Sequence, residues 1–138
     1  MGFIPYKVDG SNRPESLEYL PAAAITPEIG MALYWDASNG VLAKCTGYTN
    51  KPTHICKTKG TAALTAGDVI PVTKINPDVV YEVPSQADNS STNLGAMVQI
   101  HTDGCQVTAT TSNSPKVQLV GKGPKGGVAG DVVYVRIP

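Results

Sequence analysis

Five side chains in this sequence could bind a metal ion or act as a nucleophile, namely those of Cys45, His54, Cys56, His101 and Cys105. Cysteine and histidine are the usual zinc ligands, and a Cys-His pair is the basis of thiol-dependent hydrolysis. The spacing argues against a zinc site, because no two of the three cysteines have the gap of about two to four residues found in zinc knuckles. Cys45 and Cys105 alternate with small apolar residues, as buried thiols do. The sequence therefore predicts no metal site and no cofactor.

A second candidate for chemistry is the glycine-rich segment 121–127 (GKGPKGG), whose composition is that of a phosphate-binding loop. It lacks the Gly-x-x-x-x-Gly-Lys-Ser/Thr order and precedes a predicted strand instead of a helix, so we interpret it as an exposed connection. The carboxylates Asp36, Asp68, Asp103 and Asp131 all fall at turn signals, where aspartate bonds nearby backbone amides. Nothing pairs them for acid–base catalysis. We predict that the protein is not an enzyme.

The composition favours a single domain without a strongly charged partner. The chain has 138 residues, and its 11 basic and 11 acidic residues leave no net charge to attract nucleic acid or an anionic membrane. We therefore expect no nucleic-acid partner and no membrane partner. Only 16% of the residues are charged, against roughly 25% in ordinary soluble proteins. Three cysteines, an odd number, and an N-terminus without a signal-peptide pattern predict reduced thiols and synthesis in a cytoplasm.

Residues 1–28 differ from the rest of the chain. They contain four prolines and no sustained periodicity of a strand or a helix, which favours an extended N-terminal arm in front of a β domain at 29–138. The apolar residues of the arm are spaced irregularly, as in a segment that docks against a partner. Its candidate contact residues are Phe3, Ile4, Tyr6, Tyr19 and Leu20.

From residue 30 onward, short β-type runs are separated by turn residues, which predicts an all-β fold, a compact antiparallel sandwich or barrel. The expected strands cover residues 31–35, 41–45, 54–58, 69–72, 79–83, 96–100, 106–110, 117–120 and 132–137. Asn39-Gly40 and Asp103-Gly104 predict tight hairpin turns. Pro71 cannot donate a ladder hydrogen bond, so we expect its strand at a sheet edge or a bulge.

The β domain repeats one pattern of turns and strands. Gly30 and Gly95 open similar segments, and each is followed at a similar distance by a hairpin glycine, Gly40 in the first segment and Gly104 in the second. The run AGDVIPV at 66–72 then recurs as AGDVVYV at 129–135. We predict two pseudo-repeated halves at about 30–84 and 95–138.

The arm, the run from Ile29-Gly30 to Gly40-Val41-Leu42, and the strand 66–72 together resemble the small head-decoration and head-fibre-base proteins of tailed bacteriophages. The resemblance covers about residues 28–138 and consists of short glycine-based motifs. It implies a virion protein that binds the major capsid protein on the capsid exterior, as a homo-trimer, and stabilises the shell. The arm residues named above would then be the capsid contact. The chain has no long fibre-like repeat, which favours plain decoration over a head-fibre role.

Two functions of other classes stay open. A carbohydrate-binding β-sandwich module would use exposed aromatic side chains at Tyr34, Trp35 or Tyr48. However, Trp35 lies on a strand beside a tight turn, where we expect it to be part of the core. A small hydrolase would need a Cys-His site with a rapidly reacting Cys56.

Overall fold

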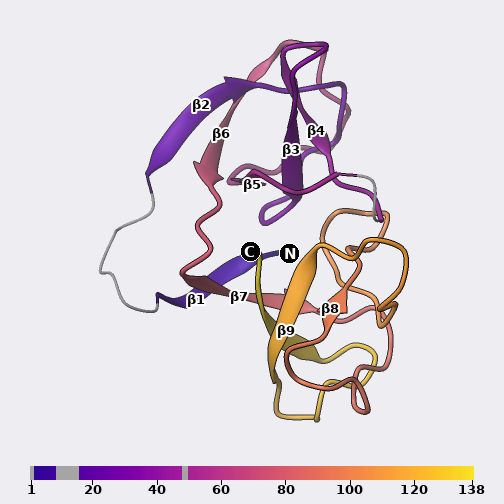
Figure 1. Ribbon diagram of the computed structural model, residues 1–138. Helices are drawn as coiled ribbons and strands as arrows, with labels where there is room; N and C mark the ends of the chain where they lie inside the picture. The colour runs from indigo at the N-terminus through magenta and orange to yellow at the C-terminus, as the bar shows by residue number, and fades with distance from the viewer. Residues whose placement is uncertain (1, 9–15, 48–49) are drawn as a thin grey trace.

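A computed structural model describes residues 2–8, 16–47 and 50–138. These residues form two antiparallel sheets of five strands each, packed together as a sandwich, which confirms the predicted all-β class (Figure 1). The strands are β1 (Ile4–Val8), β2 (Leu17–Pro21), β3 (Ala32–Asp36), β4 (Val41–Lys44), β5 (His54–Cys56), β6 (Val69–Lys74), β7 (Val79–Pro84), β8 (Met97–Val98), β9 (Val117–Lys122) and β10 (Val132–Arg136). No helix in this described part of the chain is long and apolar enough to cross a membrane.

With one exception, each sheet is built from strands that are consecutive in the sequence. The first sheet has the order β1-β7-β10-β9-β8, and the second sheet has the order β2-β6-β5-β3-β4. In Figure 1 the second sheet forms the upper lobe and the first sheet the lower lobe. Each lobe therefore corresponds to one half of the sequence, and β1 is added to the lobe of the second half.

The two lobes repeat the same strand pairing. In the first half β2 pairs antiparallel with β6, and Pro21 at the end of β2 lies opposite Val69. In the second half β7 pairs antiparallel with β10, and Pro84 at the end of β7 lies opposite Val132. Val69 and Val132 are the valines of the two Ala-Gly-Asp-Val motifs, so equivalent residues are paired in both halves. The two motifs thus occupy the same register position in the two lobes.

The two Ala-Gly-Asp-Val turns are closed by equivalent hydrogen bonds. The Gly67 N–H donates to the Ala22 carbonyl at 2.8 Å, and the Gly130 N–H donates to the Ser85 carbonyl at 2.9 Å. Both glycines have positive φ, +98° at Gly67 and +87° at Gly130, a conformation that glycine adopts without steric cost. The shared sequence motif therefore produces the same turn in both halves.

The strand pairing shifts the boundary between the halves. The sequence motifs indicated half-repeats at about 30–84 and 95–138, but β2 opens the first half and β7 opens the second. The boundary therefore lies between β6 and β7. The glycine motifs missed it because they mark only the later strands of each half.

The described residues of the N-terminal segment, 2–8 and 16–28, include two extended strands, and these strands belong to the sandwich. β1 pairs with β7 and β2 pairs with β6, so one segment supplies an outer strand to each sheet. The Gly2 N–H donates to the Ile29 carbonyl at 3.0 Å, and the Phe3 N–H donates to the Gly30 carbonyl at 2.7 Å. These bonds hold the start of the chain against the turn that precedes β3.

Two apolar clusters fill the lobes. The larger cluster consists mainly of residues of the first sheet and includes Ala32 and Ile55 from the second, so it joins the two lobes. The smaller cluster consists mainly of residues of the second sheet and the chain next to it, such as Leu33, Leu42 and Val72, and it also includes Cys105. The sandwich is therefore held by one core centred on the upper lobe and one core shared by both lobes.

Two local predictions were wrong. β6, which contains Pro71, lies in the interior of its sheet between β2 and β5. Pro71 is accommodated because β5 ends at Cys56, opposite Val72, and the Pro71 carbonyl accepts the Lys57 N–H at 3.0 Å. The expected strand at 106–110 is absent, because Val107 alone forms single bridges to Ser85 and Ile100.

Candidate binding surface

The structure separates the five candidate contact residues of the N-terminal segment. Phe3 is buried in the larger core, with 1% of its surface exposed, so its expected role as a capsid contact is wrong. Ile4 and Leu20 are half-buried. Tyr6 and Tyr19 are exposed by 57% and 65%, but they belong to different sheets. The segment therefore offers two separate surface positions.

Tyr6 forms an aromatic pair on the outer face of the first sheet. It is the extra residue of an irregularity in the β1–β7 register between Pro5 and Lys7. Such a bulge redirects the side chain of the extra residue. The Tyr6 ring lies on the Tyr134 ring of β10, with the ring centroids 4.4 Å apart and the planes tilted by 43°. Tyr134 faces outward because its neighbours Val133 and Val135 are buried.

The two rings border a shallow depression of about 340 Å³, which we call the aromatic patch. Val80, only 2% exposed, lies beneath it. Gly121 leaves room for the Tyr134 ring, because a Cβ atom at Gly121 would lie 3.2 Å from Tyr134 Cδ2. The lining residues are Tyr6, Val80, Val120, Gly121, Tyr134 and Arg136. The patch therefore combines apolar and aromatic surface with one guanidinium group.

The hydroxyl group of Tyr134 stays neutral at physiological pH. Burial raises its pKa above the ordinary tyrosine value, and the nearby Glu82 carboxylate raises it further. A neutral phenol can donate one hydrogen bond while its ring packs against an apolar group. The aromatic patch is thus suited to contact a protein surface or a sugar ring.

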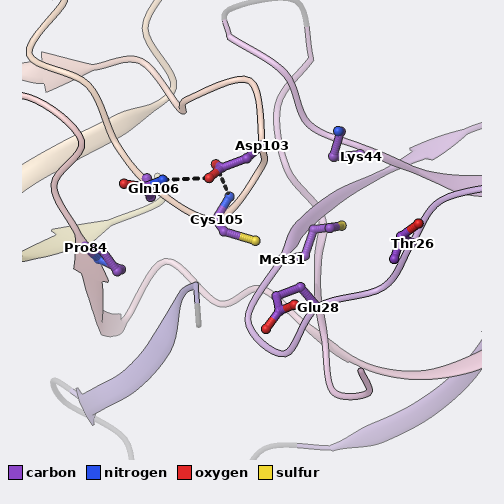
Figure 2. A pocket seen from close by; sticks show the side chains of 8 residues that line it. All are labelled: Thr26, Glu28, Met31, Lys44, Pro84, Asp103, Cys105 and Gln106. Atoms are coloured by element: carbon purple, nitrogen blue, oxygen red, sulfur yellow. Dashed lines mark hydrogen bonds between the residues drawn. The ribbon is translucent and has the colours of Figure 1, made fainter. Parts of the chain in front are cut away.

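A second depression, of about 550 Å³, lies between the lobes (Figure 2). Its charged side chains are Glu28, Lys44 and Asp103. The Asp103 carboxylate accepts the Cys105 N–H at 2.8 Å and the Gln106 Nε2–H at 2.7 Å, as the dashed lines in Figure 2 mark. Asp103 therefore stabilises its own hairpin turn, as the sequence predicted for turn aspartates.

The glycine-rich segment 121–127 is closed around a carboxylate of the same lobe. The Asp131 Oδ2 atom accepts the Lys125 N–H at 3.0 Å and the Gly127 N–H at 2.9 Å. Burial opposes ionisation of Asp131, but these backbone donors outweigh it and lower the pKa of the carboxyl. The Lys122 ammonium donates to the Ser90 carbonyl at 2.7 Å. The backbone amides at Lys125 and Gly127 are thus used internally by the loop.

The thiols and imidazoles do not gather into one site. The residues that the structure describes contain no group of three or more His, Cys, Asp or Glu side chains that could hold a metal ion. Cys45, Cys56 and Cys105 are all buried. His54 lies 3.7 Å from a Glu18 carboxylate oxygen, and burial lowers its pKa despite that charge. The lowered pKa favours the neutral form of the His54 imidazole.

The three thiols are expected to react slowly with a thiol reagent in the native protein. Burial raises the pKa of Cys45 to about 12 and that of Cys105 to about 11, and it also raises the pKa of Cys56. Since the thiolate is the reactive form, native protein at pH 7 should react much more slowly than protein unfolded in urea. Spectrophotometric titration with an aromatic disulfide measures both rates. Rapid native reaction of Cys56 would instead support the hydrolase.

Trp35 lies at the surface rather than in the core, with 40% of its area exposed. Its neighbour Tyr34 is half-buried against the larger core, and successive strand residues face opposite sides. The two rings therefore cannot form one platform. Tyr48, the third residue considered for sugar binding, lies outside the described residues.

The fold and the surface define a two-lobed β-sandwich protein with an exposed aromatic patch. Neither protein-family models nor curated proteins match the chain.

Proposed function

We propose that the protein is a decoration protein that binds the outer surface of a tailed-phage capsid and stabilises the shell. The observation that carries the proposal is the aromatic patch, in which Tyr6 is 57% exposed beside Tyr134. Exposed groups of large apolar side chains commonly mark protein interaction sites, and tyrosine and arginine are frequent at the centres of such interfaces. The resemblance of the glycine motifs to head-decoration proteins supplies the partner, the major capsid protein.

The proposed contact requires little rearrangement of the protein. Tyr6 is positioned by the bulge in β1, and Tyr134 lies on β10 in the interior of the sheet. A preorganised aromatic surface loses little conformational entropy on binding. Repeated capsid subunits would bind many copies of this surface in equivalent positions, which would reinforce the shell lattice.

Cosedimentation with empty shells tests the proposal. Under the proposal, the genome that encodes this chain also encodes a major capsid protein. Shells are assembled from that protein, and the bound fraction is measured over a concentration series. We expect saturable binding, and Tyr6→Ala should weaken it by about tenfold or more, as loss of an interface anchor does. Leu94→Ala is the matched control, because Leu94 is 60% exposed but lies outside the patch. No saturable binding, or equal binding by Tyr6→Ala, would contradict the proposal.

A carbohydrate-binding module is the second candidate, and the exposure of Trp35 favours it. Aromatic rings exposed at a surface can stack on sugar rings through their apolar faces. The same sedimentation assay distinguishes the two functions when shells are replaced by insoluble polysaccharides. Binding to a polysaccharide that is lost in Trp35→Ala and retained in Tyr6→Ala would favour the carbohydrate-binding function.

A further inference from the structure

The internal repeat identifies a strand position that is filled in one lobe and that no described strand fills in the other. In the first sheet, β1 pairs with β7 and places Ile4 opposite Glu82. The residue equivalent to Glu82 is Tyr19 of β2, because each lies two positions before the proline that ends its strand. β2 is the outermost strand of its sheet, and no described strand pairs with its Leu17–Tyr19 portion on the side away from β6. Among the described residues, the edge of β2 therefore has no counterpart of the strand that β1 supplies to β7.

The backbone of β2 offers a hydrogen-bond ladder at this edge. Tyr19 lies opposite Pro71, which has no N–H, so these two residues form a pair without mutual hydrogen bonds. The N–H and carbonyl of Tyr19 consequently point away from β6. Because strand groups alternate in direction, the N–H and carbonyl of Leu17 point the same way.

The other outer strands are protected against strand addition. β1 carries Pro5 and a bulge, and both features block an edge. β8 is only two residues long. β4 is bridged to the chain after β2, where the Ala23 N–H donates to the Leu42 carbonyl at 2.8 Å. Within the described ranges, β2 presents the edge that is best suited to accept a strand.

The side chains at this edge are also apolar and exposed. Leu17 is 54% exposed, Tyr19 65%, and Val69 on the neighbouring strand 59%. Leu17, Tyr19 and Pro21 are each two positions apart along β2, so their side chains point to the same face of the sheet. Val69 lies on this face as well, because it pairs with Pro21. A strand added beside β2 would cover part of this apolar strip.

We propose that β2 pairs antiparallel with β2 of a second copy of this chain, around a two-fold axis centred at Glu18. This register places Leu17 of each copy opposite Tyr19 of the other. Each such pair exchanges two backbone hydrogen bonds, and the opposed side chains bring the two apolar strips together. The Leu17–Tyr19 portion of the strand complements itself in donors, acceptors and apolar surface, as a two-fold symmetric contact requires.

One feature of this register opposes pairing and gives a sharp test. The two Glu18 residues occupy opposed positions across the two-fold axis, and like charges in opposed strand positions destabilise a sheet.

The proposed interface joins two copies, whereas the resemblance implies a trimer. It is independent of capsid binding, because the aromatic patch lies on the other sheet.

Sedimentation equilibrium of the purified full-length chain over a concentration series tests the pairing. We expect a reversible monomer–dimer equilibrium, abolished in Tyr19→Lys and retained in the similarly exposed control Leu94→Lys. Glu18→Gln should strengthen dimerisation by about two- to fivefold, which general destabilisation of the fold would not do. A monomer at all concentrations, a trimer, or a dimer unaffected by Tyr19→Lys would each overturn the proposal.

Discussion

Replacing Phe3 by alanine is expected to destabilise the fold by about 3–5 kcal/mol, as truncation of a fully buried aromatic side chain does. Phe3 is 1% exposed and meets Tyr81 edge to face, with the ring centroids 6.4 Å apart and the planes at 79°. Its removal would leave a cavity in the core that joins the lobes. Equilibrium urea unfolding of wild type and Phe3→Ala measures the loss.

Tyr6→Ala is the matched control for this experiment. Tyr6 lies a short way further along the same segment but is largely exposed, so its truncation should cost only about 1 kcal/mol. If Phe3 were a partner contact instead of a core residue, Phe3→Ala would leave the urea midpoint almost unchanged. A loss at Phe3 no larger than that at Tyr6 would contradict the assignment of Phe3 to the core.

Alanine at Gly30 is expected to displace the start of the chain, whereas alanine at the equivalent Gly95 is not. Both glycines have positive φ, +86° and +92°, so each substitution costs about 1–2 kcal/mol through backbone strain. At Gly30 the new Cβ would also lie 2.7 Å from backbone atoms of Gly2, while at Gly95 it would meet no atom within 4 Å. The total loss at Gly30 should therefore be about 3 kcal/mol or more.

The pair of variants separates local strain from packing of the N-terminus. Urea unfolding gives the stability of each variant, and hydrogen exchange at the Phe3 amide reports whether its bond to the Gly30 carbonyl persists. We expect faster exchange at Phe3 in Gly30→Ala and unchanged exchange in Gly95→Ala. Equal losses of stability in both variants would show that the contact between Gly2 and Gly30 is unimportant.

Features with a local cause were predictable from the sequence. Gly40 closes the first hairpin with an N–H donated to the Asp36 carbonyl at 2.8 Å, and Gly104 closes the second with an N–H donated to the His101 carbonyl at 2.9 Å. Tight turns depend on a few neighbouring residues, so the Asn-Gly and Asp-Gly pairs were sufficient. The repeated Ala-Gly-Asp-Val turn was visible for the same reason.

The N-terminal segment was misinterpreted because its two strands belong to different sheets. β1 enters the first sheet and β2 the second, so one segment faces two cores and shows no single periodicity. The bulge at Tyr6 interrupts the alternation further. The burial of Phe3 depends on Tyr81, a residue that the sequence does not connect to it.

The candidate surface was predictable only in part. Tyr6 was identified from the sequence, but its partner Tyr134 lies near the opposite end of the chain and no local pattern joins them. Alternation with Val133 and Val135 could have shown that Tyr134 faces outward. Trp35 was expected in the core, yet β5 pairs with β3 only at Ala32 and Leu33, so Trp35 extends beyond that pairing.

A cryo-electron microscopy map of shells saturated with the protein is the decisive test of capsid decoration. We predict copies at equivalent positions on the outer surface, with Tyr6 and Tyr134 of the aromatic patch in contact with the major capsid protein. A map with no additional density on the shell, or with bound copies whose aromatic patch faces the solvent, would contradict this function.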